Sequence, residues 1–154
     1  MYREESDSQQ KLDDFYIPFG GHLKEDNRWV ILSKKIPWNK IEADYAKQFS
    51  SSNMGAPAKP FRMALGSLII KEKLQLSDIE TVELIRETPY LQYFIGMEGY
   101  KDEAPFDSST MVLFRKRLDG KILQKANEIL FRQYQEEELK KNRKIRKKLK
   151  KKKG

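Results

Sequence analysis

Few residues in this sequence have the types and spacing that catalysis or metal binding requires. The single histidine, His22, follows two glycines, and the chain has no cysteine. A lone histidine without a cysteine or acidic partner at ligand spacing is not a metal site. The carboxylates Glu80, Glu83 and Glu87 fit the solvated face of a helix, and no phosphate loop or nucleophile elbow occurs. We therefore predict no catalytic residue, no metal site and no cofactor in this chain.

A cluster of hydroxyl and basic side chains between Asp107 and Lys125 has the residue types that phosphate binding uses. Five cations and two acids give this stretch a net charge of 5 − 2 = +3. Hydroxyls at a helix start can contact phosphates, and arginines can contact phosphates or guanine edges. An ordinary solvated helix face explains these residue types equally well. The candidate DNA-contacting residues are Ser108, Ser109, Thr110, Arg115, Lys116, Arg117, Lys121 and Lys125.

The C-terminal end holds a second basic cluster. Residues 140–153 contain eleven Lys or Arg, so the rest of the chain has 31 − 11 = 20 basic and 23 acidic residues, a net charge of −3. Such a tail would add salt-dependent, sequence-independent affinity for nucleic acid, and a solvated linker is the alternative. We expect this segment to be frayed or partly helical. The candidates for non-specific phosphate contacts are Lys140, Lys141, Arg143, Lys144, Arg146 and Lys147.

Helical periodicity recurs along the chain, whereas no alternating strand pattern persists. Helices begin near Pro37 and at Pro60, because proline is tolerated at the first helical position. Residues 29–36 (WVILSKKI) fit either a short extended segment or the start of a helix. The sequence thus predicts an all-α fold, a compact bundle of about five to six helices with a charged C-terminal tail that is helical or disordered.

Capping chemistry sets further helix boundaries. Ser77 and Glu80 match a capping box, in which each side chain bonds the other residue's backbone N–H. This motif predicts a third helix with Ile79, Val82 and Ile85 facing inward.

The second half of the chain is punctuated by proline and glycine. Pro89 ends the third helix, and Gly96 is a C′ residue for a short fourth one. We predict a fifth helix that ends at Gly120 and a sixth from about Lys121. The inward residues of the fifth helix are Met111, Phe114 and Leu118.

Composition limits the domain organisation and the compartment. The 154 residues suit one domain, and the two ends are poor in large apolar groups. We therefore divide the chain into a polar N-terminal tail (1–14), a helical domain (15–134) and a charged linker or basic tail (135–154). The acidic, polar N-terminus is not a signal peptide, and the longest near-apolar run, residues 63–70, is far short of the ~20 residues that a membrane span needs. We expect a soluble, cytoplasmic protein without membrane or small-molecule partners.

Three stretches together resemble the N-terminal domain of bacterial insertion-sequence transposases of the DDE type. They are IPW at 36–38, LSD-ETVE-IRE-PYLQYF-G at 76–96, and FDSST-FRKRL at 106–118. The resemblance covers roughly residues 29–125 with order and spacing kept. It implies a helical domain that binds double-stranded DNA at the transposon's terminal inverted repeats. In this family the chemistry belongs to a following ribonuclease-H-like domain, whose acidic residues hold divalent metals.

Two functional hypotheses follow from these residues, together with a third. We expect the chain to end inside the linker before the catalytic domain, so the leading hypothesis is a helix-turn-helix-like DNA-binding module without catalysis. The alternative is an assembly module that pairs transposase subunits as a homodimer, binding nucleic acid only through its basic tail. Tyr90, Tyr93, Phe94 and Tyr100 would supply its apolar surface. The third hypothesis is a truncated protein that occupies transposon ends and represses transposition.

Overall fold

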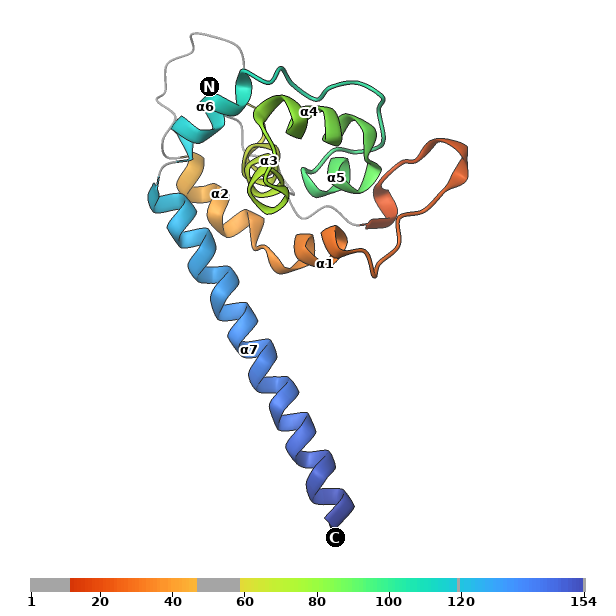
Figure 1. The fold of residues 1–154 in the computed structure, drawn as a ribbon, viewed down its shortest axis with the longest axis vertical. Coiled ribbons are helices and arrows are strands. Elements are labelled where there is room, and N and C mark those ends of the chain that lie inside the picture. The colour runs from red at the N-terminus through yellow and green to blue at the C-terminus, as the bar shows by residue number, and fades with distance from the viewer. Residues whose placement is uncertain (1–11, 47–58, 119, 154) are drawn as a thin grey trace.

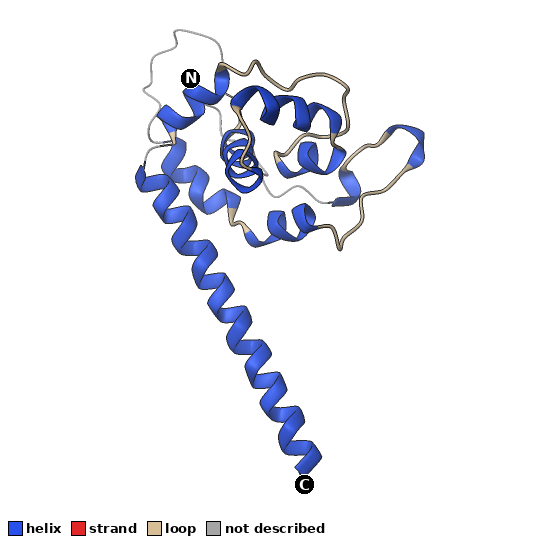
Figure 2. Ribbon diagram, in the orientation of Figure 1, coloured by secondary structure: helices blue, strands red, loops and turns tan. Residues whose placement is uncertain are grey.

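Helices joined by loops make up the computed structural model, which describes residues 12–46, 59–118 and 120–153 (Figures 1 and 2). Apart from an isolated bridge between Tyr16 and Gly99, no β-structure occurs in these ranges. The all-α prediction is confirmed, and most of the predicted N-terminal tail lies outside the described residues. The α-helices in this part are α1 (Arg28–Lys35), α2 (Trp38–Ala46), α3 (Phe61–Leu74), α4 (Asp78–Glu87), α5 (Pro89–Phe94), α6 (Thr110–Arg117) and α7 (Gly120–Lys153).

The described residues contain one α-helix more than the five to six predicted, because the sequence pattern of α1 fits an extended segment as well as a helix. The side chain of Asn27 accepts a hydrogen bond of 2.8 Å from the N–H of Trp29, so Asn27 caps this helix. Trp29, Val30 and Ser33 are buried on one side of α1. The stretch WVILSKKI is therefore a helix up to Lys35 rather than an extended segment.

Helix α3 runs through the centre of the bundle and packs against α2, α4, α5 and α6 (Figure 1). Phe61, Ala64, Leu65 and Ile70 of α3 are fully buried. Aromatic rings fill the space between α1, α2 and α5, where Phe94 meets Trp29 and Trp38 edge-on at centroid distances of 5.1 and 5.6 Å. These edge-to-face contacts are the favoured geometry for aromatic pairs.

A buried arginine, Arg62 of α3, joins four helices at this centre. Its Nε donates to the carbonyl of Phe94 at 2.9 Å, and its Nη2 donates to the carbonyl of Tyr93 and to Ser33 Oγ at 2.9 and 2.8 Å. The guanidinium also lies 4.9 Å from the ring centroid of Trp38. Only 2% of Arg62 is exposed. The guanidinium thus fixes α1, α2 and α5 against α3 through polar contacts inside an apolar core.

Capping chemistry at α4 is close to the prediction. The N–H of Glu80 donates to Ser77 Oγ at 3.1 Å, whereas the Glu80 carboxylate accepts from the Ser77 hydroxyl at 2.9 Å rather than from its backbone N–H. The inward position predicted for Ile79 is wrong, because 67% of this residue is exposed. Positions 79 and 85 are about 120° apart on a helix, so Ile85 is buried together with Thr81 and Val82 instead.

The end of α5 follows the glycine signal. Gly96 has a φ of +84°, and its N–H donates to the carbonyl of Tyr93 while the N–H of Met97 donates to that of Gln92. These two hydrogen bonds define a Schellman motif with Gly96 at C′, as predicted. The predicted role of Gly120 is wrong. Helix α6 ends at Arg117 because Leu118 has ψ 80°, outside the helical region, and Gly120 begins α7.

Helix α7 has 34 residues and a length of about 51 Å at 1.5 Å per residue. Its first half packs on α2 with Ile122 and Ala126 buried, and Glu137 forms an ion pair of 3.1 Å with Lys35 of α1. Beyond this pair the helix extends away from the bundle (Figure 1). The helical alternative predicted for the tail is confirmed, and the expected fraying does not occur in the described residues, because helix continues to Lys153. Lysine and arginine are good helix formers and are favourable near a helix C-terminus.

Candidate nucleic-acid interface

Helix α6 carries four of the eight candidate DNA-contacting residues of the body, and its packing points them in different directions. Met111, Phe114 and Leu118 are buried as predicted, and Phe114 meets Phe106 at a centroid distance of 5.0 Å. The exposed side of α6 then presents Val112, Leu113 and Lys116, while Arg115 and Arg117 lie on its two flanks. Lys116 forms no ion pair with another described residue, so it is the cation of α6 that is most open to a ligand.

Arg115 is bound to the start of α4. Its Nη1 and Nη2 donate to Oδ1 and Oδ2 of Asp78 at 2.7 and 2.9 Å, a two-pronged pair, and Lys71 Nζ lies 3.4 Å from Asp78 Oδ1. Hydrogen bonding to Arg115 holds the pKa of Asp78 below its ordinary value. Such forked pairs are the strong form of the arginine–carboxylate interaction. Arg115 therefore has a role in joining α6 to α4, and DNA contact by this residue remains a prediction.

Replacing Asp78 with asparagine should lower the free energy of unfolding by about 1 kcal/mol at neutral pH, because the pair is only partly exposed. Since the pKa of Asp78 is lowered in the folded state, its stabilisation is present above its unfolded pKa and is lost as the pH falls through its folded value. Urea unfolding of both proteins from pH 7 to pH 2 measures this. A difference that stays constant with pH would contradict the assignment.

Arg117 lies on the opposite flank of α6, next to Tyr45 of α2. Burial raises the pKa of the Tyr45 hydroxyl, and the charge and hydrogen bond of the Arg117 guanidinium lower it in part. Tyr45 itself is fully buried and packs on Phe61 at a centroid distance of 5.2 Å. Arg117 thus contacts the bundle beside α2, so both arginines of α6 interact with their own fold.

The polar groups at the first turn of α6 form hydrogen bonds with one another. Asp107 Oδ1 accepts from the hydroxyl and the N–H of Ser109 at 2.7 and 2.9 Å, and these bonds hold the pKa of Asp107 below its ordinary value. The N–H groups of Thr110 and Met111 donate to the carbonyls of Asp107 and Ser108. A phosphate at this turn would meet an ionised carboxylate, which disfavours the predicted contact through Ser109. Ser108 and Thr110 are half-buried beside it.

The last two predicted residues of the body lie at a surface groove between α2 and α7. Lys125 forms an ion pair with Asp44 of α2, which joins the two helices. Lys121 is exposed one turn earlier on the same side of α7. The groove is lined by Lys40, Lys121, Gln124, Lys125, Glu128, Ile129 and Arg132. Four cations against one acid make this hollow strongly basic, and an extended hollow of this kind suits a phosphate backbone.

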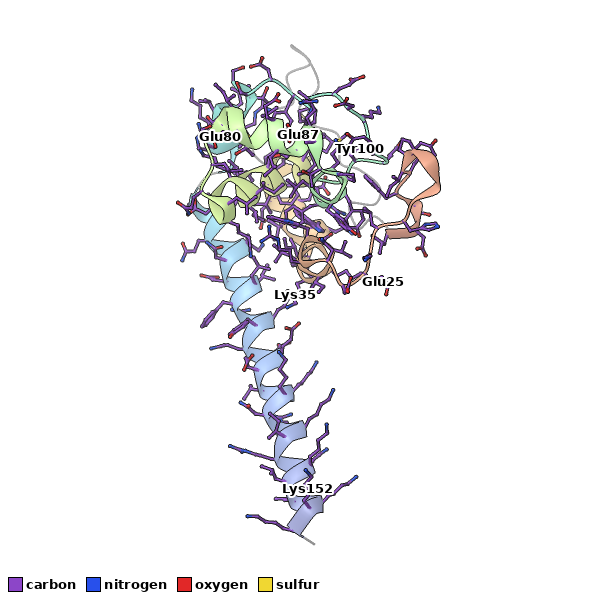
Figure 3. The ribbon with its side chains drawn as sticks, turned by 45° about the vertical axis from the view of Figure 1, so that its right-hand side comes forward. Glu25, Lys35, Glu80, Glu87, Tyr100 and Lys152 are labelled. Carbon is purple, nitrogen blue, oxygen red and sulfur yellow. The ribbon has the colours of Figure 1, made fainter. Side chains whose placement is uncertain are left out.

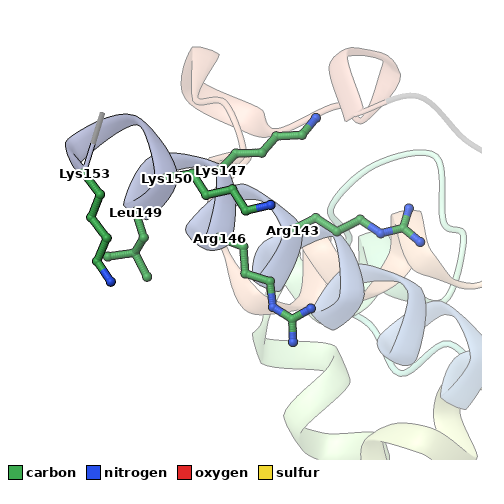
Figure 4. Close-up of a pocket in the computed structure, with 6 residues that line it drawn as sticks. All are labelled: Arg143, Arg146, Lys147, Leu149, Lys150 and Lys153. Carbon is green, nitrogen blue, oxygen red and sulfur yellow. The ribbon is translucent and has the colours of Figure 1, made fainter.

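The basic side of the groove continues along α7. At about 100° per residue, Lys121, Lys125 and Arg132 share one face of the helix with Arg143, Arg146 and Lys150, all within about 60°. Glu128 and Leu139 interrupt this face. Figure 4 shows the tail side chains Arg143, Arg146, Lys147, Leu149, Lys150 and Lys153, which border a hollow that α7 alone walls. A single helix cannot enclose a small molecule, so the hollow suits a large polyanion better.

Sequence reasoning missed Lys40 and Arg132 of the groove. Arg132 follows Lys125 by seven residues, which is two turns of a helix, so helical spacing alone could have found it. Lys40 lies 81 residues before Lys121, and only the packing of α2 on α7 brings the two together.

An acidic surface lies at the other end of the molecule. Glu80, Glu83 and Glu87 are exposed on α4, and Asp102 and Glu103 are exposed in the following loop. Figure 3 shows Glu80 and Glu87 at the end opposite Lys152. Arg86 forms ion pairs with Glu83 and Asp102 at 3.1 and 2.6 Å, which neutralises only part of this charge. A polyanion is therefore repelled by α4 and attracted to α7.

Among the described residues, no set of three or more histidine, cysteine or carboxylate side chains is grouped to hold a metal ion. In the same ranges, no helix combines the length and the apolar character that crossing a membrane would need.

Comparison with known proteins places these elements in a family. The model of the family described as "Transposase domain (DUF772)" matches residues 18–117, which include α1 to α6. A protein of Rhizobium meliloti, named "Uncharacterized protein ORF8 in nfe locus", is 38% identical over 89 residues, which are 58% of this chain and 42% of that protein. The chain thus matches less than half of this relative's length, and no solved structure matches. The resemblance to transposases indicated by the sequence motifs is confirmed, and the chain belongs to the transposase domain (DUF772) family.

Proposed function

We propose that this chain is a DNA-binding module that recognises transposon terminal inverted repeats as double-stranded DNA, in the cytoplasm and without a catalytic step or metal ion of its own. The groove between α2 and α7 and the outer side of α6 contact the duplex. The tail of α7 adds phosphate contacts that do not depend on base sequence. Membership of the transposase family supports a role in transposition.

The observation that carries the proposal is the continuity of positive charge along one side of α7. Lys121, Lys125 and Arg132 belong to the part that packs on the bundle, whereas Arg143, Arg146 and Lys150 belong to the projecting part. From Lys121 to Lys150 the face extends for about 43 Å, which is longer than one ~34 Å turn of B-DNA. A duplex along this face contacts folded body and tail together.

We assign base recognition to the body, whose packed helices can hold side chains against base edges, and phosphate contacts to the tail, which projects from the bundle (Figure 1). Lys116 on α6 and Lys121 and Gln124 on α7 are exposed near the junction of the two helices. Lysine can bind guanine edges, and glutamine can bind adenine. Phosphate contacts by the tail then set the affinity, while these residues set the preference for sequence.

Selection from a pool of random duplexes tests whether the chain recognises a sequence. We expect the full-length protein at about 0.15 M salt, where non-specific binding is weakened, to enrich a defined motif. The same selection with Lys116, Lys121 and Gln124 replaced by alanine should enrich it poorly. Enrichment of no motif by the native protein would contradict recognition of terminal repeats and would leave only non-specific binding.

Neutralising the groove should weaken binding to any duplex, and most strongly to the selected motif, because Lys121 lies in the groove and is also assigned to base recognition. We expect the triple variant Lys40→Ala, Lys121→Ala, Arg132→Ala to lose about 10-fold or more in affinity, since each lost phosphate contact removes counterion release. Fluorescence anisotropy with a labelled duplex measures the change. The matched control removes the same charge from exposed lysines outside the groove, as Lys24→Ala, Lys73→Ala, Lys101→Ala. Equal losses in the two triple variants would show that the groove has no special role.

A further inference from the structure

The aromatic residues that the sequence suggested for an assembly surface are too buried to form one. Tyr93 and Phe94 are 1% and 0% exposed. Tyr90 and Tyr100 are half-buried, and the Tyr90 hydroxyl accepts a hydrogen bond of 3.0 Å from the N–H of Lys24. Since these rings belong to the core of the monomer, an apolar contact between two chains must use other residues.

Helix α7 exposes an apolar face of its own. Phe131 and Tyr134 are 61% and 60% exposed, and Ile145 and Leu149 are each 55% exposed. On an ideal helix these four side chains lie within about 60° of one another. Successive members are about 3, 11 and 4 residues apart, and 11 is the sum of 4 and 7. Apolar spacings of three, four and seven residues are typical of helices that pair along their length. Near the bundle the face continues into a hollow lined by Leu123, Asn127 and Phe131, among others.

We propose that this apolar face of α7 binds a second copy of the same chain, with the two α7 helices antiparallel and the two-fold axis near residue 140. Phe131 then faces the partner's Leu149, and Tyr134 lies beside the partner's Ile145. The apolar residues of the two copies meet in two equivalent clusters, one on each side of the axis, as an isologous interface requires. The folded bodies lie at opposite ends of the paired helices.

Charge selects the antiparallel direction. Residues 141–153 carry ten cations and no acid, whereas residues 127–139 carry four glutamates and one arginine, a net charge of 1 − 4 = −3. A parallel pair sets the ten cations of one chain beside the ten of the other. The antiparallel pair sets each basic segment beside an acidic one, which is the complementary arrangement.

Individual positions on the apolar face agree with this direction. Glu138 lies at the middle of the face, and in the antiparallel pair it is close to the partner's Lys141. In a parallel pair Glu138 would oppose the same glutamate of the second copy, which destabilises a helix pair. The basic side of α7 with Lys121, Arg132 and Arg143 points about 125° away from the apolar face, so the pairing leaves the proposed DNA-binding side open.

Sedimentation velocity of the full chain without DNA tests the proposal, with a matched pair of leucine variants. Leu149 is on the apolar face, whereas Leu139 is equally exposed at 57% but lies about 110° away. We expect a dimer for the native chain and for Leu139→Gln, and at least a 10-fold weaker dimer for Leu149→Gln. The double variant Phe131→Gln, Leu149→Gln should be monomeric with an unchanged circular dichroism spectrum. A native monomer at all concentrations, or equal effects of the two leucine variants, would overturn the proposal.

Cysteine cross-linking tests the direction, since the chain has no native cysteine. We expect Asn127→Cys and Lys152→Cys chains, mixed and oxidised, to form a disulfide between positions 127 and 152. Asn127→Cys alone should cross-link poorly, because its two copies are about 39 Å apart in the antiparallel pair. Efficient cross-linking of Asn127→Cys with itself would overturn the antiparallel arrangement.

Discussion

Replacing Arg62 with alanine is expected to lower the free energy of unfolding by about 3–5 kcal/mol, a large part of the total for a small domain. The guanidinium donates to Ser33 Oγ and to the carbonyls of Tyr93 and Phe94, and hydrogen bonds from a charged donor contribute about 1.5–3 kcal/mol each. Alanine also leaves a cavity beside Trp38. Urea unfolding followed by the fluorescence of the two tryptophans, both buried, measures the loss.

Three further variants separate the causes of this loss. Arg62→Met keeps most of the volume, so its cost of about 2–3 kcal/mol reports the hydrogen bonds without the cavity. Arg62→Lys keeps the charge but has no planar fork, so it should recover only part of the stability. Arg28→Ala is the control, because Arg28 also stacks on a tryptophan, at 5.3 Å from Trp29, but is exposed and should cost less than about 1 kcal/mol. Native stability of Arg62→Lys would show that the fork geometry is unimportant.

Neutralising the tail is expected to weaken DNA binding by about 100-fold or more at 0.1 M salt, without unfolding the bundle. The variant replaces with glutamine the six predicted phosphate-binding residues, Lys140, Lys141, Arg143, Lys144, Arg146 and Lys147. All six are exposed on a part of α7 that projects from the bundle (Figure 1). Glutamine is a good helix former, so the helix is retained while its charge is lost.

The salt dependence of binding identifies the mechanism of this loss. The plot of log affinity against log salt should become shallower by about 0.9 for every tail cation that contacts a phosphate. Preference for the selected motif over an unrelated duplex should be unchanged, because the tail does not read bases. If preference and affinity are lost together, the body has no DNA site, and the chain is better described as an assembly module with a non-specific basic anchor.

The features that the sequence predicted correctly depend on interactions between residues close together in the chain. The Ser77 cap and the Gly96 turn depend on hydrogen bonds within a few residues, so their signals are readable without a fold. The buried residues of α6 also follow from periodicity, since Met111, Phe114 and Leu118 lie on one side. The family resemblance rests on motifs whose spacing is equally local.

Features that depend on distant partners were missed. Arg115 looks like a free cation until Asp78, 37 residues away, is brought beside it. Arg62 looks like a surface arginine at the start of a helix, and only the packing of α5 on α3 places carbonyl groups around it. The exposed position of Ile79 likewise reflects which side of α4 packs on its neighbours.

Helix α7 is unbroken from the bundle to Lys153, so the direction of each side chain on its projecting part is fixed relative to the part that packs on the bundle. One residue inserted after Glu137 would turn every later side chain by about 100° about the helix axis, so Arg143 and Leu149 would no longer align with Arg132 and Phe131. Four inserted residues would come within about 40° of the original phase while lengthening the rod by about 6 Å. Insertions or deletions in this segment therefore keep the basic and apolar faces aligned only when their length is close to a whole helical turn.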